Sequence, residues 1–151
     1  MRRVVVDTNV LISAILSPHG AAREVVRQCL LGHIRPLVSN AFFLEYEDVL
    51  ARDELFAGAS ITSRDRAVLL DAFLSVCKWI GITFLWRPNL PDESDNHLIE
   101  LAVAGHAESV ITGNTKDIAR GELIFDTIRI VTPGIWLEED YLHGNINDPS
   151  T

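Results

Sequence analysis

Hydrophobic and polar residues alternate along the chain in blocks that switch between a strand-like and a helix-like period. Short apolar runs rich in β-branched residues predict buried strands, and apolar residues recurring every three or four positions predict helices between them. The predicted strands cover residues 4–6, 36–39, 82–86, 109–112 and 129–132. The predicted helices cover residues 9–16, 21–31, 42–50, 64–80, 95–104 and 115–119.

Residues that favour helix ends support several of these boundaries. Ser39 or Asn40 is expected to cap the helix at 42–50, because short polar side chains accept hydrogen bonds from the first free N–H groups. Gly81 is expected to end the helix at 64–80.

Strands that alternate with helices are typical of an α/β domain with a mainly parallel sheet. The 151 residues fit one domain, and a hydrophobic content of 48% is enough to build a core without disulfides. We therefore expect a three-layer α/β/α domain over residues 1–139, with a mainly parallel central sheet. Residues 140–151 are expected to form a polar, mobile tail.

The N-terminus and the cysteines favour a cytoplasmic protein. Two arginines open the chain as in a signal peptide, but the apolar stretch that follows meets Asp7 after three residues, and no apolar run is long enough to span a bilayer. Cys29 and Cys77 lie in apolar helical patterns and are expected to be buried free thiols. The five histidines lack the spacing of a zinc site.

Four carboxylates stand where the predicted fold can bring them to one cleft. Asp7 directly follows the first strand and Asp117 follows the strand at 109–112, at the sheet edge where open α/β sheets bind ligands. Glu45 lies at the edge of the apolar face of its helix, and Asp95 stands at the top of a buried helical stripe.

Each of these acids also has an ordinary structural explanation. Asp7 is a suitable cap for the helix after it, and Glu45 is compatible with a solvated position at a helix rim. Asp95 complements a helix dipole, as do Asp92 and Glu93. Asn114 and Asp117 resemble a capping box at the start of a short helix.

The chemistry of a carboxylate cluster predicts a divalent metal ion. Carboxylates packed together repel, so at neutral pH they need a cation or raised pKa values. Hard oxygen ligands without His or Cys favour Mg²⁺ or Mn²⁺ over zinc. Such an ion engages phosphates and activates water, so the cluster predicts hydrolysis of phosphodiester bonds.

The chain resembles the PIN-domain family, and within it the small bacterial and archaeal toxins of toxin–antitoxin systems. The resemblance covers residues 3–138 and rests on an ordered set of blocks, which are residues 4–11, 39–50, 91–98, 105–114 and 132–134. It implies a parallel sheet between helices, cleavage of single-stranded RNA with Mg²⁺ or Mn²⁺, and an antitoxin protein as partner.

The resemblance also assigns roles to individual residues. Asp7, Glu45 and Asp95 match the three acidic positions that hold the metal and catalyse cleavage, and Asp117 matches the fourth more loosely. Asn9 matches a position that orients the first aspartate, and Thr112 a polar position near the metal.

Asn114 departs from the family pattern, since many close relatives carry Asp there. The change removes one negative charge and weakens the case for a second metal. Asp92 is a possible outer ligand through water.

The net charge of −8 is the main argument against a nuclease, because acidic proteins do not attract nucleic acid non-specifically. The acid cluster supplies part of this charge, and a bound metal would reverse its local sign. Only two lysines occur, so we expect arginines to meet the phosphates. The candidates, by chain position alone, are Arg2, Arg3, Arg23 and Arg87.

Two other classes of enzyme fit the sequence poorly. A phosphoacceptor signalling domain needs paired acids at its first strand and a lone acceptor Asp at a central one, but the strands end in Asp7-Thr8 and Ser39-Asn40. A phosphatase that forms an aspartyl-phosphate needs Asp-x-Asp, and Asn9 occupies the second place.

A catalytically silent PIN-like module that binds RNA or a partner protein remains the alternative. The retained acids argue against it and Asn114 argues for it. The strongly apolar helices at 21–31 and 64–80 also offer a face for a homodimer contact.

Overall fold

The computed structural model describes residues 1–82, 92–113 and 128–139. In these residues five parallel strands form one sheet in the order β3-β2-β1-β4-β5. The strands are β1 (Arg3–Val6), β2 (Arg35–Val38), β3 (Lys78–Trp79), β4 (Ser109–Ile111) and β5 (Arg129–Val131). Val4, Val5 and Val6 of the central strand β1 are fully buried, which explains why the sequence shows a continuous apolar run there.

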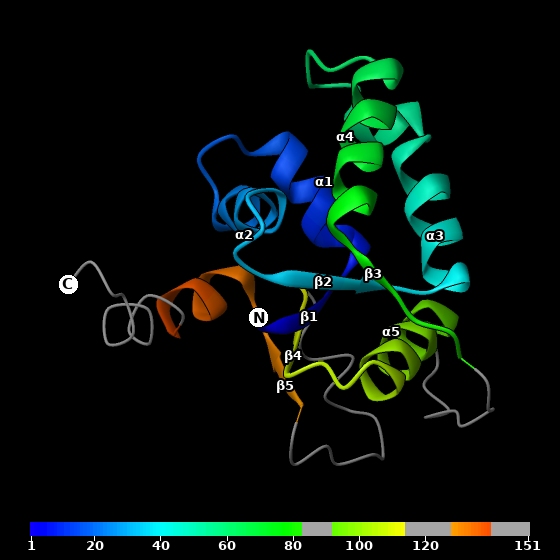
Figure 1. Cartoon of the computed structure of the whole chain (residues 1–151). Helices are drawn as coiled ribbons and strands as arrows, with labels where there is room; N and C mark the ends of the chain where they lie inside the picture. The colour runs from blue at the N-terminus through cyan, green and yellow to red at the C-terminus, as the bar shows by residue number, and fades with distance from the viewer. Residues whose placement is uncertain (83–91, 114–127, 140–151) are drawn as a thin grey trace.

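Helices cover both faces of the sheet, so the predicted three-layer α/β/α architecture is confirmed. The helices are α1 (Thr8–Leu16), α2 (Ala21–Leu30), α3 (Asn40–Leu50), α4 (Ser63–Val76) and α5 (Glu93–Ala104), with a 3₁₀ helix η1 (Asp53–Phe56) before α4. Figure 1 shows α1 to α4 together on one side of the sheet and α5 on the other. Residues 133–139 are also helical, which the sequence pattern did not predict.

Side-chain caps mark the starts of α1, α3, α4 and α5. Ser39 caps α3, its hydroxyl accepting a hydrogen bond from the Phe42 N–H at 3.2 Å. Thr62 caps α4 in a capping box with Asp65. The polar residues just before the apolar periodic segments therefore mark the helix starts to within a residue or two.

The prediction of one helix over 64–80 is wrong at its C-terminal end. α4 ends at Val76, and Lys78–Trp79 pairs in parallel with β2. The Ile80 N–H continues this pairing by donating to the Val38 carbonyl at 2.8 Å. The free edge of β2 offers backbone partners that local periodicity cannot reveal. Ile82, the start of the predicted strand at 82–86, is not in a strand, and residues 83–86 lie outside the described residues.

The prediction that both cysteines, Cys29 and Cys77, are buried free thiols is confirmed. Trp136 is fully buried. Trp79 falls within the predicted helix at 64–80 but lies on the edge strand β3, where it is 48% exposed and its ring centroid lies 5.5 Å from that of Phe43.

Across residues 1–82, 92–113 and 128–139, the structure contains no helix that meets the length and hydropathy needed to cross a membrane. The predicted tail at 140–151 lies outside the described residues.

Candidate active site

Asp7 stands at the C-terminal edge of the two central strands. Its N–H donates to the Ile111 carbonyl at 2.9 Å, which extends the pairing of β1 with β4 by one residue. One carboxylate oxygen, Oδ1, accepts the Thr8 N–H at 2.7 Å, so Asp7 is the N-cap of α1. The cap occupies one oxygen and leaves Oδ2 directed elsewhere, so capping does not exclude a second role.

Asn9 and Thr112 hold the second oxygen of Asp7. The Thr112 hydroxyl donates to Asp7 Oδ2 at 2.7 Å, and Thr112 is fully buried. Asn9 Nδ2 lies 3.4 Å from the same oxygen and 3.3 Å from Thr112 Oγ1. The Gly113 N–H donates to Asn9 Oδ1 at 3.0 Å, which leaves the amide nitrogen of Asn9 facing Asp7. This network ties the start of α1 to the end of β4 and fixes the Asp7 carboxylate.

Helix α3 brings Glu45 to the same edge. The neighbouring Tyr46 is fully buried, and its hydroxyl donates to the Val6 carbonyl, immediately before Asp7. This hydrogen bond fastens α3 to the end of β1. Glu45, half-buried on the next position of the helix, therefore lies close enough to Asp7 for the two charges to interact.

Helix α5 contributes Asp92 and Asp95 from its first turn. Asp92 is the N-cap, with Oδ1 accepting the Ser94 N–H at 2.9 Å. The Ser94 side chain forms a hydrogen bond with Glu45, and the charges of Asp92 and Asp95 both act on Glu45. The N-terminal end of α5 thus meets α3 at the edge where Asp7 lies.

Burial and mutual repulsion shift the protonation of this group. Burial, as the largest cause, and the charges of Asp7, Asp92 and Asp95 raise the pKa of Glu45 to about 7, against a lowering by the Ser94 hydrogen bond. Burial also raises the pKa of Asp7, while hydrogen bonds from Thr112 and Thr8 lower it. Glu45 therefore exchanges a proton near neutral pH, and a cation placed here would favour its ionised form.

The described carboxylates lie close enough for their charges to interact. Among the residues that the structure describes, no group of three or more His, Cys, Asp or Glu side chains is arranged to hold a metal ion. Asn114 and Asp117, the other two predicted members, lie outside the described residues. The donor chemistry nevertheless fits Mg²⁺ or Mn²⁺, because the polar atoms at this edge are carboxylate and hydroxyl oxygens, which these ions prefer as ligands.

A comparison with protein families identifies the family of the chain. The family model of the PIN domain matches residues 3–116, which is most of the chain. The chain belongs to the PIN-domain family. The matched segment runs from β1 past β4, so it includes Asp7, Glu45 and Asp95 and ends one residue before Asp117. PIN domains are generally nucleases and typically use divalent metal ions. The chain therefore has a fold of nuclease type, and membership of the family implies a nucleic-acid substrate. No curated protein matches the chain.

The three described arginines among those predicted to meet phosphates do not lie with the carboxylates of this PIN domain. Arg2 and Arg3 lie at the start of β1, at the other edge of the sheet, where Arg2 Nε pairs with Glu108 at 2.5 Å. Arg23 Nε donates to the Ala14 carbonyl at 2.7 Å, near the end of α1. Chain position alone did not show that these guanidinium groups bind other parts of the fold. Arg87 lies outside the described residues.

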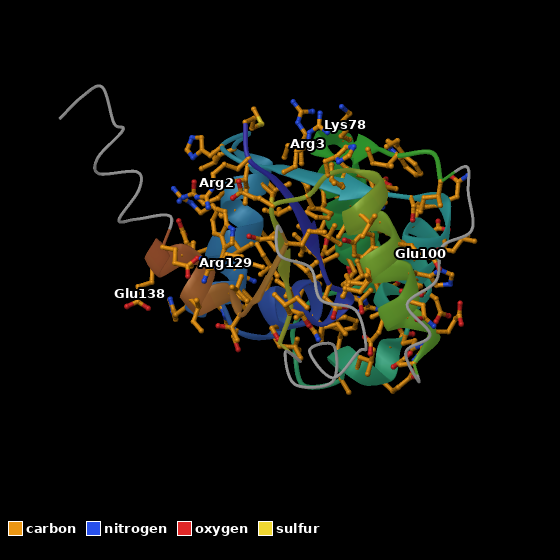
Figure 2. The ribbon with its side chains drawn as sticks, turned by 90° about the horizontal axis from the view of Figure 1, so that it is seen from below. Arg2, Arg3, Lys78, Glu100, Arg129 and Glu138 are labelled. Atoms are coloured by element: carbon orange, nitrogen blue, oxygen red, sulfur yellow. The ribbon has the colours of Figure 1, made fainter. Side chains whose placement is uncertain are left out.

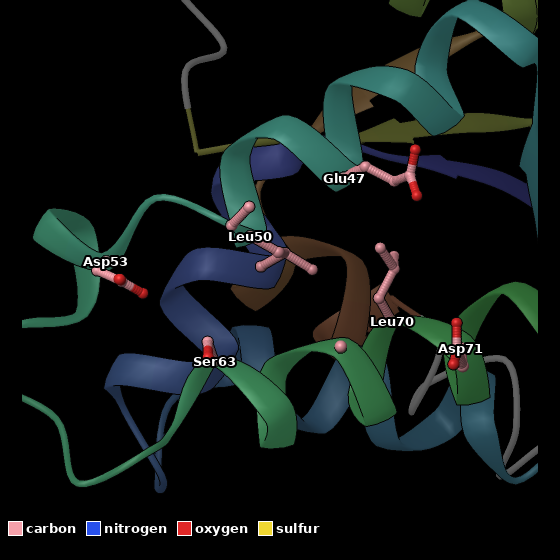
Figure 3. Close-up of a pocket in the computed structure, with 8 residues that line it drawn as sticks. Glu47, Leu50, Asp53, Ser63, Leu70 and Asp71 are labelled. Atoms are coloured by element: carbon pink, nitrogen blue, oxygen red, sulfur yellow. The ribbon is translucent and has the colours of Figure 1, made fainter.

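Two hollows of the PIN domain lie near α3. One, of about 240 Å³, opens at the carboxylate edge of the sheet, since Ser39 after β2, Ile80 after β3 and His97 of α5 line it. The other, of about 300 Å³, lies between α3 and α4. Figure 3 shows Leu50 and Leu70 facing each other across it, with Glu47 and Asp71 toward one end. Only the first hollow shares the edge where Asp7 stands.

Sequence reasoning missed two residues that position the site. Tyr46 lies on the apolar face of its helix, but a buried tyrosine hydroxyl usually needs a hydrogen-bond partner, and this one donates to the carbonyl at the end of β1. Ser94 lies within the block at residues 91–98, but its hydrogen bond to Glu45 depends on how α3 and α5 pack. No local signal reveals that contact.

Proposed function

We propose that this PIN domain is an endoribonuclease that hydrolyses phosphodiester bonds of single-stranded RNA with Mg²⁺ or Mn²⁺. One observation carries the proposal. In a fold of nuclease type, Glu45 lies half-buried near Asp7, Asp92 and Asp95, and burial together with these charges raises its pKa to about 7. Such an arrangement costs stability unless a cation or a proton compensates the charge.

Asp7, Glu45, Asp95 and Asp117 are the residues proposed to hold the ion and to act in catalysis. When bound, the ion supplies an activated water and neutralises charge on the phosphodiester. Asn9 and Thr112 fix the orientation of the Asp7 carboxylate through the hydrogen bonds described above. Asn114 and Asp92 are proposed as supporting residues, Asp92 through its charge near Asp7 and Glu45.

The proposed biological setting is a toxin–antitoxin system, with this chain as the cytoplasmic toxin. An antitoxin protein and a second copy of the chain are the proposed partners. This part of the proposal is supported by the resemblance of the sequence blocks to small prokaryotic toxins, and by the exposed apolar residues Leu16, Leu30 and Leu31 on or next to α1 and α2.

The test is cleavage of a labelled single-stranded RNA by purified protein, in Mn²⁺ and in EDTA. We expect cleavage in Mn²⁺ only, and a loss of at least about 100-fold in the Asp7→Asn and Asp95→Asn variants, since each removes a charged ligand. Asp71→Asn is the matched control, because Asp71 is exposed on α4 beside the other hollow. Equal cleavage by all variants would reveal a contaminating nuclease and refute the assignment.

A catalytically silent module that binds RNA or a partner protein is the second candidate function. It is favoured by the lack of a metal-holding group among the described acids and by the neutral Asn114. RNA binding without cleavage, at any concentration of Mn²⁺ that saturates the protein, would establish this second function instead.

A further inference from the structure

Three cations gather at the sheet edge opposite the carboxylates. The first residues of β1, β2 and β3 are Arg3, Arg35 and Lys78. Because the strands are parallel, these three residues lie at the same edge of the sheet. Together with Met1 they line a hollow of about 480 Å³, here called the basic pocket. Figure 2 shows Arg3 and Lys78 next to each other at one margin of the molecule.

The register of the strands puts the three side chains on one face of the sheet. Arg3 pairs with Arg35, and Lys78 pairs with Leu37, two residues further along β2. Paired residues share a face, and so do residues two apart on one strand. The Nη1 atom of Arg3 donates to the Gly105 carbonyl at 3.1 Å, and Gly105 ends α5. The basic pocket therefore opens on the side of the sheet that α5 covers.

The positive charge of the basic pocket is not balanced by the described part of the protein. Neither Arg35 nor Lys78 forms an ion pair with any acid in residues 1–82, 92–113 or 128–139. Glu108, which precedes β4 at the same edge, is bound to Arg2. Three like charges side by side repel one another, so the arrangement favours an anionic ligand.

We propose that the basic pocket binds phosphate groups of an RNA strand. This inference rests on the proposed function, which makes RNA the substrate. Two guanidinium groups match phosphate oxygens in pairs, and the lysine adds a point charge. Because β1 has four residues, the pocket lies about 13 Å from Asp7 along the strand. An RNA strand held in the basic pocket extends beyond the cleavage site. The pocket thus gives an acidic protein the cationic contact that its carboxylate edge lacks.

The experiment measures binding of a fluorescently labelled single-stranded RNA of about ten nucleotides by anisotropy, in EDTA so that no cleavage occurs. We expect the Arg35→Ala/Lys78→Ala variant to bind at least about tenfold more weakly. The slope of log affinity against log salt should fall by about 1.4, since single strands lose about 0.7 per phosphate contact.

Arg27→Ala/Arg52→Ala is the matched control. It removes the same charge from two exposed arginines that pair with Glu24 and Asp48 on their own helical segments. We expect the control to bind RNA like the wild type, and circular dichroism to show both double variants folded. Equal affinity of the two double variants, or no RNA binding by the wild type, would overturn the proposal.

Competitors identify what the pocket accepts. Unlabelled RNA should displace the probe at far lower phosphate concentration than inorganic phosphate or pyrophosphate does. Displacement by pyrophosphate at an equal phosphate concentration would assign the pocket to a small anion and overturn the assignment to RNA. Equally strong displacement by a polyglutamate peptide would point to an acidic protein and overturn it as well.

The cleavage assay separates this proposal from the proposed function. Wild-type protein that binds RNA through the basic pocket but never cleaves it would leave the pocket standing and remove the nuclease. Cleavage with unchanged RNA affinity in Arg35→Ala/Lys78→Ala would leave the nuclease standing and remove the pocket.

Discussion

At the scale of single residues, the surroundings of Glu45 decide its chemistry. An exposed glutamate is ionised at neutral pH, but burial and three neighbouring aspartates raise the pKa of Glu45 to about 7. Asp7 differs because Thr112 and Thr8 donate to its carboxylate and oppose the effect of burial. Two carboxyl groups in one cluster thus differ in how their surroundings act on them, since burial raises the pKa of both and hydrogen bonds from Thr112 and Thr8 oppose it at Asp7.

Replacing Glu45 with Gln should change how the stability of metal-free protein depends on pH. A carboxyl group with a raised pKa contributes stability that is fully present below its unfolded value of about 4.5 and is lost as the pH rises to about 7. The Glu45→Gln variant has no carboxyl group at this position, so it does not lose this stability as the pH rises. We expect the variant to be more stable than the wild type by about 1–2 kcal/mol at pH 8, allowing for partial exposure, and not at pH 4.

Urea denaturation in EDTA, from pH 4 to pH 8, measures this difference. Glu47→Gln on the same helix is the control, since it lines the hollow between α3 and α4. Parallel stability curves for wild type and Glu45→Gln would show that Glu45 is not buried among acids.

At the scale of elements, the helix starts carry both structure and chemistry. Asp7 caps α1 and Asp92 caps α5, so two of the carboxylates at the site are also the residues that begin helices. This explains why each had an ordinary structural explanation in the sequence. Capping a helix and the proposed role at the site are compatible, because each carboxylate has two oxygens and the cap uses only one of them.

Substitutions at Asp92 should separate its cap from its charge. Asp92→Ala removes both, and we expect it to destabilise the protein by about 1 kcal/mol. Asp92→Asn keeps an oxygen that accepts the Ser94 N–H but removes the charge that acts on Asp7 and Glu45. We expect Asp92→Asn to preserve stability and to lower the pKa of Glu45.

Thermal unfolding and NMR titration of the Glu45 carboxyl carbon measure the two effects. If Asp92→Asn were as destabilised as Asp92→Ala, the cap would depend on the charge, and the separation would fail.

At the scale of the whole molecule, charge is distributed between the two ends of one sheet. The carboxyl ends of the strands carry Asp7 and its neighbours, while the amino ends carry the cations of the basic pocket. A net charge of −8 describes neither end. The parallel sheet produces the separation because all five strands begin at one edge and end at the other.

Divalent metal should stabilise the folded domain through the acidic end. A ligand that binds only the native state stabilises it by about 2.7 kcal/mol at a concentration 100 times its Kd. We expect Mn²⁺ to raise the Tm of the wild type and of Asp71→Asn, and to leave that of Asp7→Asn nearly unchanged. Differential scanning calorimetry in Mn²⁺ and in EDTA measures the shifts. A shift in Asp7→Asn as large as in the wild type would place the metal elsewhere.

The sequence by itself determined the α/β class, the alternation of strands and helices from β1 to β4, and most helix starts. These features follow from local physics, since periodicity decides which face is apolar and a cap needs partners only two or three residues away. It also indicated Asp7, because a polar residue directly after a buried strand must lie at the sheet edge. That Asp7, Asn9 and Thr112 meet there agrees with the resemblance to the PIN-domain family.

Only the tertiary structure decided what depends on partners distant in sequence. Lys78–Trp79 became a strand because β2 had a free edge, although its own pattern favoured a helix. Burial and the charges of Asp7, Asp92 and Asp95 raise the pKa of Glu45, and no spacing within α3 reveals these surroundings. Arg35 and Lys78 lie 43 positions apart in the chain, and only parallel pairing of their strands places both cations in one pocket. Strand pairing and helix packing act between distant segments, so local pattern cannot encode their result.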